Sequence, residues 1–207
     1  MVRTPQAFYK ELGADGLAKR KTALHTRREL AHVKRHLRKR HRILDLGCGY
    51  GRCTIPLAQA GYKIVGADLS DTLLREARGR ARAKDLQIAF MKEDMRALSF
   101  KDKSFERVLC LWSAFSELHR IPEQVKALKE MQRVLDVGGL AIIDLPRRRG
   151  RQEAVVTHHV EGVKSMPTYM HTKTSMRQLL RRAGIRNYEL HFEDFGGRER
   201  LLVFFWA

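Results

Sequence analysis

Short apolar runs alternate along the chain with longer segments of helical periodicity. Runs of strand length occupy residues 43–46, 62–67, 86–91 and 105–112. The segment after the second run places its apolar side chains on one helical face, namely Leu73, Leu74, Ala77 and Ala81. Strands that alternate with helices predict an α/β fold with a mostly parallel sheet, right-handed crossovers and helices on both faces.

The last third of the chain has a different pattern. Residues 154–160 and 169–172 are expected to form an irregular hairpin or a mobile cover, and residues 174–183 a helix that ends at Gly184. Apolar and polar side chains alternate over 188–193, which is typical of a strand with one wet face. The final run, 201–206, is too apolar for an exposed edge and fits a strand between two neighbours.

A glycine-rich motif follows the first apolar run. Asp45 precedes three glycines at alternate positions, Gly47, Gly49 and Gly51, and a helical pattern opens after them. Glycine is needed where backbone turns tightly and approaches a ligand closely. A dinucleotide fingerprint that starts at Gly47 would need glycine at position 52, where the chain has Arg52, so the motif favours a different ligand.

The pattern Asp-x-Gly-x-Gly-x-Gly resembles the first motif of the class I S-adenosylmethionine-dependent methyltransferases, here of the small stand-alone type. Three further landmarks stand in the order of that family: Asp68 after the second run, Glu93-Asp94 after the third, and Gly138-Gly139 before the fifth strand. The resemblance covers roughly residues 40 to 145. It implies a Rossmann-like seven-stranded sheet with an antiparallel last strand, and S-adenosyl-L-methionine as cofactor.

The resemblance also implies where the cofactor binds. The glycine loop would pack against the methionine part, Asp68 would accept hydrogen bonds from the ribose hydroxyls, and Asp94 would contact the adenine. Ligands of such sheets bind beyond the carboxyl ends of the strands. The expected cofactor site therefore consists of Asp45, Gly47, Cys48, Gly49, Gly51, Asp68, Leu69, Asp94, Met95 and Leu111.

Catalytic residues are harder to assign than the cofactor. No Asn-Pro-Pro-Tyr or Asp-Pro-Pro-Tyr motif follows the fourth run, and Cys110 is expected to be buried rather than to act as a nucleophile. Glu117 and His119 lie in the loop above the expected methyl position, and His119 is a candidate base because imidazole titrates near neutrality. Three candidates for contact with the acceptor flank the expected cover: His158, His159 and His171. No metal site is expected.

The chain is strongly basic, with 41 Lys and Arg against 23 Asp and Glu and a net charge of +18. A basic amphipathic helix is expected between Thr22 and Arg42, with Arg28 and Arg35 on one face with Arg42. A second basic cluster spans 147–151. Such clusters can bind phosphates. The alternative interpretation is a solvated face in a highly charged protein.

The 207 residues are expected to form a single methyltransferase domain, with a basic helical region at 1–40 and a substrate-side insertion or cover at 147–172. Three cysteines, an odd number, favour a reducing compartment over a disulfide framework. Neither a secretory leader nor an apolar run of membrane length is visible. A cytoplasmic protein is therefore expected.

The function expected first is methyl transfer to an oxygen or nitrogen nucleophile of a small-molecule acceptor. Residues 111–118 and the tail 193–205 resemble family members that act on small metabolites. The basic charge alone motivates an alternative, an RNA methyltransferase that acts, for example, on tRNA. A third interpretation is a protein that binds the cofactor or nucleic acid without catalysis. The sequence determines neither the acceptor nor the oligomeric state.

Overall fold

The computed structural model describes residues 11–13, 15–18, 22–148, 152–157 and 167–207. The residues 149–151 of the second basic cluster and the candidates His158 and His159 lie outside this part of the chain. Residues 11–13 and 15–18 are helical. The named helices are α2 (Ala23–Lys34), α3 (Thr54–Gln59), α4 (Asp71–Arg82), the 3-10 helix η1 (Ala114–Glu117), α5 (Ile121–Val134) and α6 (Lys173–Arg182). The strands are β1 (Arg42–Leu46), β2 (Lys63–Asp68), β3 (Phe90–Lys92), β4 (Phe105–Cys110), β5 (Leu135–Pro146), β6 (Ala154–Thr157), β7 (Pro167–Met170), β8 (Tyr188–Asp194) and β9 (Glu199–Trp206).

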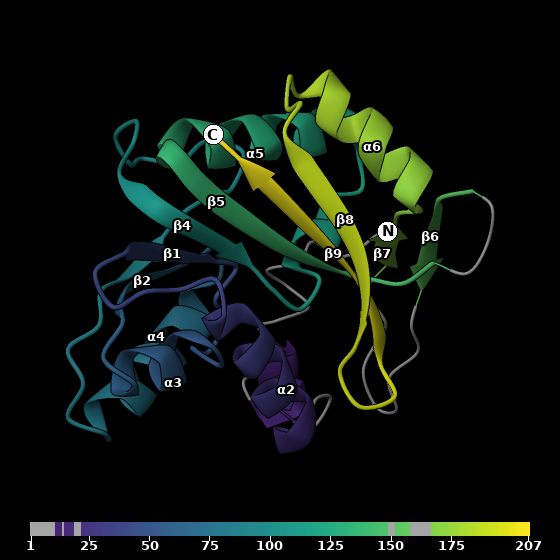
Figure 1. Ribbon diagram of the computed structural model, residues 1–207. Coiled ribbons are helices and arrows are strands. Elements are labelled where there is room, and N and C mark those ends of the chain that lie inside the picture. The colour runs from purple at the N-terminus through teal and green to yellow at the C-terminus, as the bar shows by residue number, and fades with distance from the viewer. Residues whose placement is uncertain (1–10, 14, 19–21, 149–151, 158–166) are drawn as a thin grey trace.

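Seven of these strands form one sheet in the order β3-β2-β1-β4-β5-β9-β8. The first five pair in parallel, whereas β9 runs antiparallel between β5 and β8. The remaining strands, β6 and β7, pair as a separate antiparallel hairpin. The Rossmann-like sheet with an antiparallel last strand is confirmed, and so is the insertion of the final apolar run between two neighbours (Figure 1).

Helices cover both faces of the sheet, with α5 and α6 on one side and α2, α3 and α4 on the other (Figure 1). Side chains of each strand alternate between the two sides, as the pleat requires. In β1, for example, Leu44 packs in the cluster with α5 and α6, while Ile43 packs in the cluster with α2 and α3. Both strand faces are therefore apolar, which explains the nearly continuous apolar runs in the sequence.

The N-terminal helix is shorter than the sequence predicted. α2 ends at Lys34, and the chain turns before β1 instead of remaining helical as far as Arg42. Leu30, Val33 and Leu37 are buried, as the apolar stripe predicted. However, Leu37 reaches the core from the turn after the helix, so the seven-residue repeat of arginines does not lie on one helical face.

Two other boundaries differ from expectation. Of the run expected at 86–91, only its last two residues and Lys92 form β3, which pairs with β2 through Phe90, Met91 and Lys92. The pair Gly138-Gly139 lies inside β5, where the register with β4 shifts, rather than in a turn ahead of the strand. Among the described residues, no helix combines the length and apolarity needed to cross a membrane.

Candidate cofactor site

The glycine loop joins β1 to α3 at the carboxyl edge of the sheet. The amides of Gly47 and Cys48 both donate to the carbonyl of Ala67 in β2, at 2.7 and 3.0 Å, which fixes the loop to the neighbouring strand. Gly47 and Gly49 both have positive φ, at 76° and 55°, a backbone conformation that favours glycine. A Cβ at Gly47 would collide with the Cβ of Ala114, whereas a Cβ at Gly49 would meet, among the described residues, only Leu73, at 3.8 Å. The Gly49 side of the loop therefore has room for a ligand.

Asp68 ends β2 directly beside this loop. Its Oδ2 accepts a hydrogen bond from the Gly49 amide at 2.8 Å, and its Oδ1 accepts one from the Ser70 amide at 2.8 Å. Burial raises the pKa of Asp68, against the lowering effect of these backbone donors. A carboxylate offers about four lone-pair sites. Asp68 can therefore hold the loop and still accept two ribose hydroxyls.

Asp45 lies beneath the loop rather than on its surface. It is 2% exposed, and its Oδ2 accepts a hydrogen bond from Thr54 Oγ1 at 2.6 Å. Burial raises the pKa of Asp45 to about 6, against the hydrogen bond from Thr54 that lowers it. This placement suits a residue that supports the loop and the start of α3 from below.

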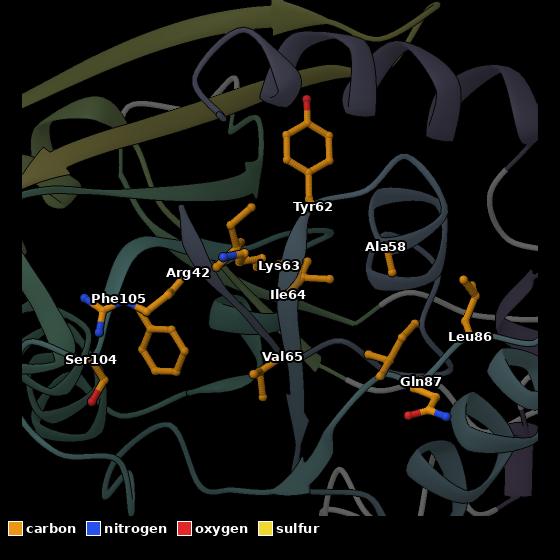
Figure 2. Close-up of a pocket in the computed structure, with 12 residues that line it drawn as sticks. Arg42, Ala58, Tyr62, Lys63, Ile64, Val65, Leu86, Gln87, Ser104 and Phe105 are labelled. Atoms are coloured by element: carbon orange, nitrogen blue, oxygen red, sulfur yellow. The ribbon is translucent and has the colours of Figure 1, made fainter. Parts of the chain in front are cut away.

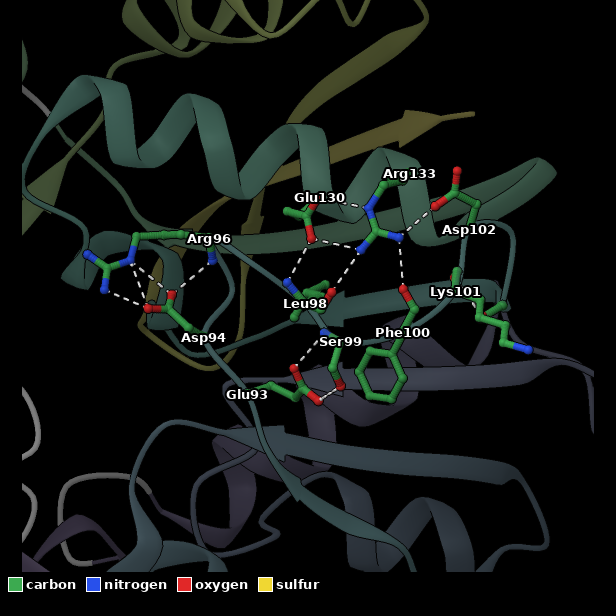
Figure 3. A network of polar contacts seen from close by, with 11 residues as sticks. Glu93, Asp94, Arg96, Leu98, Ser99, Phe100, Lys101, Asp102, Glu130 and Arg133 are labelled. Carbon is green, nitrogen blue, oxygen red and sulfur yellow. Dashed lines mark hydrogen bonds and ion pairs between the residues drawn. The ribbon is translucent and has the colours of Figure 1, made fainter.

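Asp94 follows β3 and belongs to a polar network on the α5 side (Figure 3). Arg96 donates to its carboxylate from Nη2 at 2.6 Å and from Nε at 2.9 Å, and donates from Nη1 to Glu123 of α5 at 2.9 Å. The hydrogen bonds from Arg96 lower the pKa of Asp94, so its carboxylate is ionised and fixed in orientation. Next to it, Met95 is half-buried against the core.

The side chains of the other expected cofactor residues are buried or half-buried. Leu69 is half-buried at the start of the turn into α4. Leu111 is 4% exposed and packs with the α2 and α3 cluster, so its side chain belongs to the core. Cys48 is also buried, and burial raises the pKa of its thiol. Cys110 is fully buried in β4, which likewise raises its thiol pKa and makes it a poor nucleophile, as expected.

The two catalytic candidates lie in and after η1. Glu117 is the last residue of η1 and is half-buried. His119 Nε2 lies 2.8 Å from the carbonyl oxygen of Pro167 in β7, so this nitrogen carries the proton and donates it. His119 therefore fastens the β6–β7 hairpin over the loop after β4, and its Nδ1 is the nitrogen left to accept a proton.

His171 follows β7 and faces the core. It is 1% exposed, its ring stacks on Tyr169 with centroids 4.6 Å apart, and its Nδ1 lies 3.3 Å from Ser175 Oγ. Burial lowers the pKa of His171 to about 4. The residue is therefore a neutral core side chain between the hairpin and α6.

This burial predicts a loss of stability in acid. The unfolded chain takes up the His171 proton near 6.5 and the folded protein only near 4, so stability falls as the pH drops through this interval. We expect this residue to lower the free energy of unfolding by about 2 kcal/mol between neutral pH and about pH 5. Urea unfolding at both pH values should show a smaller difference for His171→Phe than for the unmodified protein. Equal differences would contradict the assignment, and the exposed His191→Gln serves as control.

A hollow of about 460 Å³ lies at the opposite edge of the sheet (Figure 2). It is lined by the first residues of β1, β2 and β4, including Arg42, Lys63 and Phe105. Because these are the amino ends of the strands, the hollow is separate from the glycine loop. Within the described residues, no three His, Cys, Asp or Glu side chains gather as metal ligands.

The sequence did not reveal two buried ion pairs, one directly after the glycine loop and one between β5 and β9. Arg52 pairs with Glu29 of α2 at 2.6 Å, and Arg200 of β9 pairs with Asp144 of β5 at 2.6 Å. One feature of the sequence could have indicated the second pair. Asp144 is a single carboxylate in the apolar run of β5, and a buried carboxylate needs a charged or polar partner.

The chain was compared with known proteins. Residues 43–139 match the family described as "Methyltransferase domain". The chain is 37% identical over 132 residues to the methyltransferase GfsG of Streptomyces halstedii, a stretch that covers 62% of this chain and 46% of that protein. It is 35% identical over 108 residues to the demethylmenaquinone methyltransferase of Thermus thermophilus, which covers 51% of this chain and 47% of that protein. The matches thus span about half the length of these relatives.

The fold matches solved structures over nearly the whole chain. The 1,6-didemethyltoxoflavin-N1-methyltransferase of Burkholderia thailandensis, solved with its substrate and S-adenosylhomocysteine, aligns with a TM-score of 0.79 and 17% identity, covering 98% of this chain and 86% of that one. At this identity the likeness concerns the fold. Residues 43–139 therefore carry a methyltransferase domain, and its sheet and the glycine loop beside Asp68 have the arrangement of the class I S-adenosylmethionine-dependent methyltransferases.

Proposed function

We propose that this protein transfers the methyl group of S-adenosylmethionine to an oxygen or nitrogen nucleophile of a small-molecule acceptor. The observation that carries the proposal is the glycine loop, where the described residues leave room at Gly49, with the Asp68 carboxylate fixed beside it. The acceptor class is supported by the relatives: GfsG and the demethylmenaquinone methyltransferase are named as methyltransferases, the second for a quinone.

The proposed cofactor site keeps the residues expected from the sequence, with roles assigned by their placement. Asp68 receives the ribose hydroxyls, the Gly49 side of the loop faces the methionine part, and Asp94 lies at the adenine end. Met95 and Leu69 supply apolar contact there. Asp45, Cys48 and Leu111 act from the core as supports of the loop and of β4.

The bound sulfonium already makes the methyl group electrophilic. The protein's own task is therefore to align the acceptor, to exclude water and, for some acceptors, to remove a proton. Glu117 and His119 remain the candidates for proton removal. Since His119 donates from Nε2 to the hairpin, it would act from Nδ1, and Glu117 is the carboxylate nearest to it in the chain.

The structure disperses the basic residues that motivated the RNA alternative. Arg42 lies on β1 and donates to Glu106 from Nη2 at 2.8 Å and from Nε at 3.0 Å. Arg28 packs against Gly196 in the turn between β8 and β9, while Arg35 caps the end of α2. These three arginines therefore do not form one continuous phosphate-binding face, which favours a small acceptor.

Substitution of the three arginines tests the choice between acceptors. For Arg28→Gln/Arg35→Gln/Arg42→Gln we expect unchanged S-adenosylhomocysteine binding, because all three arginines are exposed and exposed surface charges contribute little. We also expect the unmodified protein to purify without nucleic acid, read by its absorbance ratio and by mass spectrometry. It should bind bulk tRNA only weakly at physiological salt.

The RNA alternative predicts tight tRNA binding by the unmodified protein and weaker, less salt-dependent binding by the triple variant. Each lost phosphate contact would reduce the slope of log affinity against log salt by about 0.7–0.9. Arg28→Gln/Arg35→Gln is the matched control, since it leaves the Arg42–Glu106 ion pair intact. Sub-micromolar binding and methylation of bulk tRNA by the unmodified protein would refute the small-molecule assignment.

A further inference from the structure

The turn between β4 and η1 has an unfavourable backbone conformation. Its two residues, Trp112 and Ser113, both have left-handed backbone, with φ of 51° and 65°. This region is unfavourable for residues with a Cβ, and especially for a bulky one. Such conformations persist only where the surrounding structure enforces them. The contacts of this turn therefore identify the residues that hold it.

One set of contacts comes from the neighbouring strands β5 and β9. Asp144 Oδ2 accepts the Trp112 amide at 3.0 Å, and the Asp144 carbonyl accepts the Ser113 amide at 3.0 Å. Arg200 donates from Nε to Asp144 Oδ1 at 2.6 Å and from Nη2 to Oδ2 at 3.0 Å. The same Nη2 donates to Ser113 Oγ at 2.6 Å. One guanidinium thus fixes both the carboxylate that holds the turn and a side chain of the turn.

The Asp144–Arg200 pair is deeply buried. Asp144 is fully buried, and the Arg200 side chain is 12% exposed. Burial of an ion pair costs desolvation that its attraction often fails to offset, so a buried pair is weak support for stability alone. Here the fork geometry of arginine matches three acceptor atoms at once, which gives the pair a role in geometry.

The turn and the first residue of η1 contact the glycine loop and Arg52, the residue directly after the loop. Ala114, directly after Ser113, packs so closely on Gly47 that no side chain fits there. At the other end of the loop, the Arg52 guanidinium lies over the Trp112 ring, 4.8 Å from its centroid, and is itself paired with buried Glu29 of α2. Any displacement of the turn would therefore be transmitted to the loop that faces the cofactor.

We propose that Arg200 is a positioning residue of the methyl-transfer site: it holds the Trp112–Ser113 turn through Asp144, and Trp112 packs beside the glycine loop under Arg52. Figure 1 shows β9 beside β5. Their register pairs Arg200 with Pro146, and the Arg200 side chain reaches Ser113 after β4. The proposal rests on the cofactor site proposed above and is independent of the acceptor.

Tryptophan fluorescence can test the placement of the turn. The chain has two tryptophans, so Trp206→Phe leaves Trp112 as the only one. In this background, saturating S-adenosylhomocysteine should change the Trp112 emission. Arg200→Gln should shift the emission of the ligand-free protein to longer wavelength and weaken S-adenosylhomocysteine binding by at least about tenfold. Arg200→Lys should be intermediate, since it keeps the charge without the fork.

A second variant covers the case in which Arg200→Gln fails to fold because Asp144 is left as an unpaired buried charge. Asp144→Leu/Arg200→Met removes both charges at similar volume, a replacement that proteins usually tolerate. It should fold and show the same loss of affinity. Arg42→Gln is the matched control, an arginine paired with a carboxylate at the other edge of the sheet, and should leave emission and affinity unchanged.

Three results would overturn the proposal. The first is an unchanged Trp112 emission at saturation with S-adenosylhomocysteine, with binding verified by calorimetry. The second is unchanged affinity in the folded double variant. The third is absence of S-adenosylhomocysteine binding in the unmodified protein, which would refute the cofactor site and this proposal with it, whereas the first two refute only the role of the turn.

Discussion

Gly49→Val is expected to abolish S-adenosylhomocysteine binding and to leave the domain folded. Gly49 has a φ of 55°, and in the part of the chain that the structure describes a Cβ there would meet only Leu73, at 3.8 Å. A branched side chain would therefore enter the space beside the loop rather than the core. The left-handed backbone adds strain of roughly 1–2 kcal/mol, which a domain of ordinary stability withstands. Calorimetric titration and thermal unfolding would measure the two effects separately.

Substitutions at two other glycines distinguish the effect of backbone strain from the effect of blocking the ligand. Gly138 has a φ of 71° and no atom of the described residues within 4 Å of its Cβ position, so Gly138→Val carries similar strain away from the site and should bind normally. Gly47→Ala should instead destabilise the fold, because its Cβ would collide with Ala114. A folded Gly49→Val protein that binds as well as Gly138→Val would show that the loop does not approach the ligand.

The sequence predicted those parts of the fold that depend on local pattern. The helix α4 needs only the apolar spacing of Leu73, Leu74 and Ala77 on one face. The end of α6 needs only Gly184, which has a φ of 84°. The insertion of β9 could be predicted because a run as apolar as 201–206 does not suit an exposed edge strand.

The boundaries that failed depend on contacts across the fold. The apolar spacing of Leu30, Val33 and Leu37 continues past the end of α2, although Leu37 is buried from a turn, so spacing alone cannot show where the helix stops. At the sheet edge, Leu86 and Ile88 pack against the core without pairing, and only Phe90–Lys92 join β2. Apolar character does not distinguish packing from pairing.

In the candidate site, too, the sequence could predict the local motif but not the contacts between distant residues. The glycine loop and Asp68 are close in sequence and have fixed spacing, so a motif could identify them. The Asp144–Arg200 pair joins residues 56 positions apart, and the Arg52–Glu29 pair joins residues 23 apart. These two ion pairs depend on the order of the strands in the sheet and on the packing of α2, and neither can be read from a local sequence pattern.

Asp68→Ala is expected to weaken S-adenosylhomocysteine binding by roughly tenfold to 150-fold, because hydrogen bonds to a charged group contribute about 1.5–3 kcal/mol. The structure adds a second reason for a loss. The Gly49 amide donates to Asp68 Oδ2, so the substitution also removes the acceptor that holds the loop in place. Affinity would be measured by calorimetry at a temperature where both proteins are folded.

Asp71→Ala is the matched control for Asp68→Ala. Asp71 opens α4 three residues later, is exposed and pairs with Lys92 at 2.5 Å, so its loss removes a similar charge without touching the loop. Asp68→Asn should fall between the two, since the amide keeps one acceptor. Unchanged affinity in a folded Asp68→Ala protein would refute the assignment of the ribose to this carboxylate.

The most direct test of the cofactor assignment is calorimetric titration of the unmodified protein with S-adenosylhomocysteine, and in parallel with NAD and NADP. The glycine loop lacks the third glycine of a dinucleotide site and has Arg52 in that place. We therefore expect one S-adenosylhomocysteine to bind per chain and neither nicotinamide dinucleotide to bind measurably. Binding of NAD or NADP, with no heat from S-adenosylhomocysteine, would contradict the assignment.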